Sequence, residues 1–204
     1  MGPLLLGVLL VFGIGILVVL IIGGAGVSIY NRLVALRNDF KNQFAQIDVQ
    51  LKRRHDLIPN LVETAKGYMA HERGTLDEVV AARNGAMAAR QQAGADPSDP
   101  NGVQKVVAAE GVLTQSLGRL FAVAEAYPDL KANQTMLQLQ NELTDTENRI
   151  SQARQAYNES VRNYNTQREI FPNSLLAGIF NFAPASLYEI AEPGNREVPK
   201  VSFA

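Results

Sequence analysis

Two histidines and one short charged run are the residues of this sequence that could bind a metal ion or take part in catalysis. His55 and His71 are the only histidines, and the charged run is Lys52, Arg53, Arg54, His55 and Asp56. A di-iron carboxylate site in a helical bundle needs inward Glu-x-x-His pairs, but Lys52 and Tyr68 stand three residues before the histidines. An HExxH zinc motif would need histidine where Thr75 stands. We therefore expect no metal site.

Other catalytic motifs are also missing from the sequence. It has no cysteine, which excludes thiolate nucleophiles and disulfides. It has no G-x-S-x-G nucleophile elbow and no P-loop or dinucleotide fingerprint after a strand. The net charge of -1 gives no basic footprint for a phosphate backbone. We therefore predict that the protein is not an enzyme, holds no cofactor and binds no nucleic acid.

The charged run has two interpretations. Cations in a last helical turn complement the helix dipole and solvate the end of a bundle. Alternatively, the run forms an interhelical or intersubunit ion-pair network with acids of other helices. Under the second interpretation, the candidate ion-pair or interface residues are Lys52, Arg53, Arg54, His55, Asp56, Glu63, His71 and Glu72, together with acids of the last long helix.

The elements that position these residues begin with an uncharged apolar run. No side chain from Met1 to Asn31 is charged, and the 19 residues from Leu4 to Ile22 are Leu, Val, Ile, Phe and three glycines. As a helix they extend about 28 Å, close to the hydrocarbon thickness of a bilayer. A cleaved signal peptide is less consistent, because no Lys or Arg precedes the run. We predict one transmembrane helix within residues 1–29, with the lipid bilayer as partner.

Basic residues lie only on one side of this run. Arg32, Arg37 and Lys41 follow it and none precedes it. Because Lys and Arg near a span stay on the cytoplasmic side, we expect the N-terminus outside and the following domain in the cytoplasm.

Apolar residues at three- and four-residue steps predict four long helices after the span, near residues 30–58, 60–93, 103–126 and 131–168. We expect a kink or tight turn at Pro59 and a loop at residues 94–102. The last helix has the clearest register, with one heptad position formed by Met136, Leu143, Ile150, Tyr157 and Tyr164. The predicted fold is all-α: the transmembrane helix continues into an antiparallel long-helix, four-helix-type bundle over residues 30–172.

Two further features have more than one interpretation. Gly67 and Gly74, like Gly111 and Gly118, are seven residues apart, which indicates either close approach of another backbone or tolerated glycines. The tail, residues 173–204, is apolar and too short to span a membrane. We expect it to pack on the bundle or on a neighbouring subunit, with the neighbour favoured. Contact with a membrane surface is the alternative, disfavoured because the apolar segment lacks Lys and Arg.

Several segments together resemble the LemA family. They are Tyr30-Asn31, Leu36-Arg37-Asn38, the stretch AQIDVQLKRRHDLIPNLVE at residues 45–63, Lys66-Gly67-Tyr68, His71-Glu72, Ala82-Arg83, and the pattern from Leu139 to Asn158. The resemblance covers essentially the whole chain. It implies a bacterial cytoplasmic (inner) membrane protein with an N-terminal span and a long-helix bundle. It implies no settled biochemical activity.

Two functions remain open from the sequence. The favoured hypothesis is a structural or scaffolding protein that self-associates into a homo-oligomer through its helical domain. The alternative is a membrane-tethered adaptor or regulator that presents the bundle to another membrane or cytoplasmic protein.

Overall fold

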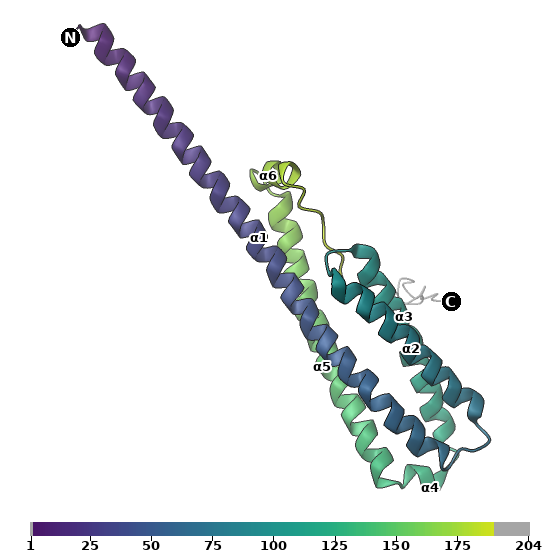
Figure 1. The fold of residues 1–204 in the computed structure, drawn as a ribbon. Helices are drawn as coiled ribbons and strands as arrows, with labels where there is room; N and C mark the ends of the chain where they lie inside the picture. The colour runs from purple at the N-terminus through teal and green to yellow at the C-terminus, as the bar shows by residue number, and fades with distance from the viewer. Residues whose placement is uncertain (1, 190–204) are drawn as a thin grey trace, which may run out of the picture.

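The computed structural model describes residues 2–189, which are mainly helical with no strand among them (Figure 1). The helices are α1 (Pro3–Lys66), α2 (Arg73–Ala95), α3 (Pro100–Ala124), α4 (Pro128–Lys131), α5 (Gln134–Glu169) and α6 (Asn173–Ile179). The prediction of an all-α fold is confirmed.

Four of these helices form an up-and-down bundle. The C-terminal half of α1 runs antiparallel to α5, α2 pairs with α3, and α2 also contacts α1 (Figure 1). Short connections make neighbouring helices antiparallel. The short helices α4 and α6 lie at opposite ends of α5.

The N-terminal part of α1 projects alone from the bundle (Figure 1). Its apolar side chains from Leu9 to Ile22 are exposed, and the helix is long and apolar enough to cross a membrane. Helix α3 is also long and apolar enough to cross a membrane, but nine of its residues are buried in the bundle. The projecting arm is thus the helical stretch within residues 2–189 that is long and apolar enough to cross a membrane and is left uncovered by the bundle.

The bundle interior is built from the predicted stripes. The heptad position of α5 is buried throughout, with Met136, Tyr157 and Tyr164 at most 1% exposed. In α1, Leu33, Phe40, Phe44, Ile47, Leu51 and Ile58 are buried, and Leu36 is partly buried. Aromatic rings pair across the two helices, with Phe40 and Tyr164 centroids 5.1 Å apart. The periodicity of the sequence therefore identifies the core faces of both helices.

Of the kink or tight turn predicted at Pro59, the tight turn is wrong. Helix α1 continues through Pro59 to Lys66, although proline cannot bond the carbonyl four residues earlier. That carbonyl belongs to His55, and the Nε of Arg83 in α2 donates to it at 2.7 Å. Burial of Ile58, Leu61 and Val62 on both sides of the proline holds the helix in place. The second predicted helix accordingly starts at Arg73 instead of residue 60.

Close approach of a backbone is not found at the spaced glycines within this chain. Gly67 is the C-cap of α1 and Gly74 lies in the first turn of α2, so the two do not share a helix. A Cβ on Gly74, Gly111 or Gly118 would meet nothing within 4 Å. These positions are open surface.

The described part of the tail packs partly on its own bundle. Ala177, Phe182, Ala185 and Tyr188 are buried in the core cluster formed with α1 and α5. Side chains of α5 bond the tail backbone: the hydroxyl of Tyr157 donates to the Ser186 carbonyl at 2.8 Å. The remainder of the tail, residues 190–204, lies outside the described residues.

Candidate functional site

The charged run lies where α1 crosses the middle of the bundle, and it is divided between interior and surface. Arg54 and His55 are 4% and 1% exposed, whereas Lys52, Arg53 and Asp56 are exposed. The two buried residues are positioned by the apolar stripe, because they fall three and four residues after Leu51, on the face that faces the core. Neither residue is at the end of a helix, so the explanation by the helix dipole is wrong for this run.

A buried ion-pair network joins Arg54 and His55 to two other helices. Arg54 bonds Glu110 of α3 through one terminal nitrogen and Glu147 Oε2 of α5 through the other, the latter at 2.6 Å. His55 Nε2 lies 2.8 Å from Glu110 Oε1. Arg154 adds a bond to Glu147 at 2.9 Å. One arginine thus connects α1, α3 and α5 at the same level of the bundle.

The electrostatics of the network keep Glu110 ionised. Burial by itself would raise the pKa of this carboxyl group. The hydrogen bond with His55 and the positive charge of Arg54 outweigh burial and hold the pKa of Glu110 below its ordinary value. A buried charge is tolerated when it is paired and hydrogen-bonded in this way. The network therefore fixes the register of three helices.

The remaining predicted site residues do not join this network. Lys52 pairs with Asp56 at 2.5 Å and Lys66 with Glu63 at 3.1 Å, both on the surface of α1. Two others lie beyond the end of that helix. Glu72 accepts a bond from the Tyr127 hydroxyl at 3.4 Å, and His71 is exposed.

Sequence reasoning missed Glu110 as the main partner of Arg54. A signal was present, because Glu110 lies in step with Val106 and Leu113 on the apolar stripe of α3. A carboxylate on such a stripe needs a buried cation. Arg54 occupies the equivalent position on α1, between Leu51 and Ile58.

The chemistry available to this network is structural. Its charged groups are bonded to one another, and none of them lines the open groove between α2 and α3. No group of three or more His, Cys, Asp or Glu that could hold a metal ion occurs within residues 2–189. The contacts of the network hold helices α1, α3 and α5 together.

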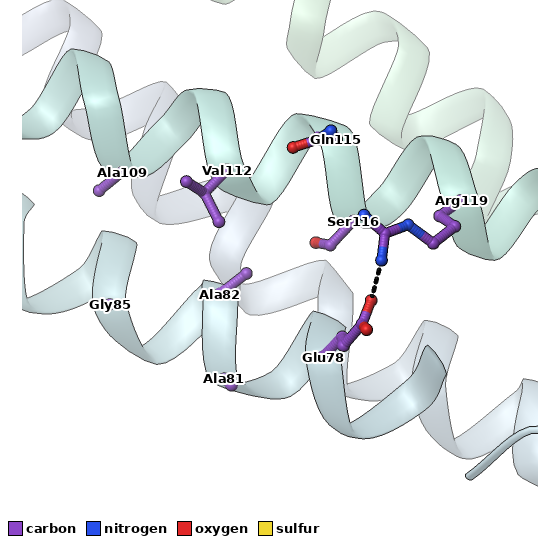
Figure 2. Close-up of a pocket in the computed structure, with 9 residues that line it drawn as sticks. All are labelled: Glu78, Ala81, Ala82, Gly85, Ala109, Val112, Gln115, Ser116 and Arg119. Atoms are coloured by element: carbon purple, nitrogen blue, oxygen red, sulfur yellow. Dashed lines mark hydrogen bonds and ion pairs between the residues drawn. The ribbon is translucent and has the colours of Figure 1, made fainter. Parts of the chain in front are cut away.

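An open groove of about 540 Å³ lies between α2 and α3 (Figure 2). Its lining consists mostly of small and apolar residues, namely Glu78, Ala81, Ala82, Gly85, Ala109, Val112, Gln115, Ser116 and Arg119. We call it the α2–α3 groove. Glu78 and Arg119 form an ion pair of 2.7 Å across it, and Ala82 points from α2 toward α3. Val112 is 57% exposed there.

Comparison with known proteins places the chain in a family. A model of the LemA family matches residues 43–203. Magnetosome protein MamQ 2 of Paramagnetospirillum magneticum is 27% identical over 184 aligned residues, which cover 83% of this chain and 68% of that protein. Magnetosome protein MamQ of Magnetospirillum gryphiswaldense is 25% identical over the same shares. With most of its length matched by the family model, and with the long-helix bundle on which that match falls, this chain belongs to the LemA family.

Proposed function

We propose that this protein is a non-catalytic scaffold of the bacterial inner membrane, anchored by the first part of α1 and self-associating through the α2–α3 groove. The observation that carries the proposal is the groove itself. It is apolar, open and lined by small residues, and no other part of the described chain fills it.

The surface around the groove favours close packing of another helix. A Cβ on Gly85, which lines the groove, or on Gly111 of the neighbouring α3 surface would meet nothing within 4 Å. Small residues let helix backbones approach closely, and an exposed apolar patch marks a contact site. Val112 supplies such apolar surface in the groove at 57% exposure.

The anchor favours a second copy as the occupant. Chains held in one membrane share an orientation and a raised effective concentration. Two copies can bring their α2–α3 grooves face to face about a two-fold axis along the membrane normal, which gives the self-complementary contact of a dimer.

Basic residues support a cytoplasmic bundle. Arg32, Arg37 and Lys41 follow the span, and no basic side chain precedes it. A reporter fused after Ala204 should be active in the cytoplasm, and activity outside would reverse the proposed orientation.

Gly85→Glu tests the groove. The substitution places a charge in the apolar surface without a clash, because a side chain at this position has open space around it. Gly85 lies in α2, so its backbone conformation suits glutamate. We expect light scattering of the detergent-extracted full chain to show an assembly for the parent protein and a smaller species for the variant.

The matched control is Gly118→Glu, which makes the same change at another open glycine, one that does not line the groove and lies on a different face of α3 from Val112. It should leave the assembly size unchanged. A monomeric parent protein that captures a different protein through the groove would favour the adaptor function and refute self-association. Equal effects of both variants would show that the groove has no special role.

A further inference from the structure

Three exposed apolar side chains, the apolar row, lie in α6 and in the turn just before it. Phe171, Leu175 and Ile179 follow one another at four-residue steps and are 79%, 60% and 69% exposed. Asn173 and Ala177, also four residues apart, are buried. Because residues four apart share a helix face, Leu175 and Ile179 lie on a face of α6 opposite the buried one, and nothing in residues 2–189 covers this face. Phe171 is exposed in the turn just before the helix.

This apolar row is held in place by the bundle. The amide of Asn173 donates to the Gln167 carbonyl at 2.8 Å, which ties the start of α6 to the end of α5. The hydroxyl of Tyr164 donates to the Ala183 carbonyl at 2.8 Å. Phe182, just after α6, is 5% exposed in the core. The row is therefore presented in a fixed position.

That position is the end of the bundle beside the apolar arm of α1 (Figure 1). The ring of Tyr30 contacts the rings of Phe180 and Phe182, with centroids 4.8 and 5.6 Å away. Tyr30 lies between the uncharged run of α1 and Arg32, the first charged residue. Tyrosines at the end of a span sit at the level of the lipid headgroups. With α1 spanning the membrane as proposed, α6 lies at headgroup depth beside Tyr30.

The same place supplies cations that the segment from Ile170 to Tyr188 lacks. No charged residue occurs from Ile170 to Tyr188, whereas interfacial segments usually combine apolar residues with Lys or Arg. Here α1 provides them: the guanidinium of Arg37 lies 5.1 Å from the centroid of Phe182. Arg32 is exposed two residues after Tyr30. The lack of Lys and Arg in the apolar segment therefore does not disfavour contact with a membrane, because α1 supplies these residues beside α6.

We infer that Phe171, Leu175 and Ile179 insert into the headgroup–acyl boundary of the membrane that α1 spans. This inference rests on the proposed membrane span and not on the α2–α3 groove. Lipid surrounds α1 at this depth, so the row meets an apolar phase without a second protein. The second attachment fixes the tilt of the bundle against the membrane, which the single span would leave free.

Tryptophan fluorescence of the full chain tests this inference, because the natural sequence contains no tryptophan. Three single variants are needed, each in vesicles of phosphatidylcholine and phosphatidylglycerol with or without brominated acyl chains. Phe171→Trp probes the row, Leu17→Trp probes the span, and Tyr68→Trp probes an exposed position beyond the far end of α1.

We expect blue-shifted emission and quenching by brominated lipid for Phe171→Trp and Leu17→Trp, and neither for Tyr68→Trp. Adding Gly85→Glu to Phe171→Trp should leave the quenching unchanged. Quenching of Leu17→Trp alone would overturn the inference and keep the span. Absence of quenching in both would overturn the inference together with the span. Blue-shifted but unquenched emission from Phe171→Trp would assign the row to a protein contact and also overturn it.

Discussion

Glu110→Gln is the substitution that examines the buried network most directly. It keeps the shape of the side chain and removes its charge, so Arg54 loses one of its two charged partners. The side chains of Arg54 and Glu110 are 5% and 7% exposed, so solvent screens their interaction little. Breaking a buried ion pair costs about 3–5 kcal/mol. Glu147 remains 2.6 Å from Arg54 but is 45% exposed, which places the expected loss near the lower limit, about 3 kcal/mol.

Thermal unfolding of the full chain in detergent, followed by circular dichroism, measures this loss. A destabilisation of about 3 kcal/mol corresponds to a fall in Tm of roughly 6–12 °C for a chain of this size. The double variant Arg54→Met with Glu110→Leu removes both charges and should lose less than the single variant, since replacing a buried pair by apolar residues leaves no unpaired charge. A Tm for Glu110→Gln equal to that of the parent protein would refute the buried network.

Three other outcomes are expected. Arg83→Met should lower the free energy of unfolding by about 1–3 kcal/mol, because the His55 carbonyl freed by Pro59 loses its donor. Denaturant titration measures this loss, and an unchanged midpoint would contradict a supporting role of the Arg83 bond. Leu143→Asp puts an unpaired carboxylate on a residue that is 7% exposed and should cost several kcal/mol, about 3–5, whereas Gln138→Ala on the exposed face should be nearly silent by the same melts. Because the pKa of Glu110 is lower in the folded state, the ionised carboxylate contributes to stability above the unfolded pKa near 4.5, and this contribution is lost as pH falls below that value. The stability of Glu110→Gln should therefore vary less with pH below 4.5 than that of the parent protein. Equal pH dependence of the two proteins would be evidence against the ionised carboxylate.

The fold class and the core faces could be predicted because periodicity reports them locally. The seven-residue spacing from Met136 to Tyr164 identifies the buried face of α5 without knowledge of any partner. Tertiary structure decides the rest. Pro59 is a helix breaker by local rules, and contacts from other helices, among them the bond from Arg83 to the His55 carbonyl, make it compatible with α1.

The candidate sites show the same division. A run of five charged residues indicates a solvated surface when only composition is considered, yet two of them, Arg54 and His55, occupy the apolar stripe and are buried. Their partner Glu110 lies 56 residues from Arg54 in the sequence, so no short motif reveals the pair. The cations beside α6 likewise come from α1, far away in the sequence. Spatial proximity of distant segments is the information that spacing alone lacks.

Cysteine cross-linking in native membranes is the most direct test of self-association through the α2–α3 groove. The natural chain has no cysteine. Val112→Cys in the groove and Val49→Cys on α1 replace the same residue type at the same exposure of 57%. We predict that mild oxidation links Val112→Cys into a dimer and leaves Val49→Cys monomeric. Absence of the Val112→Cys dimer, or equal cross-linking of both variants, would contradict the proposed assembly.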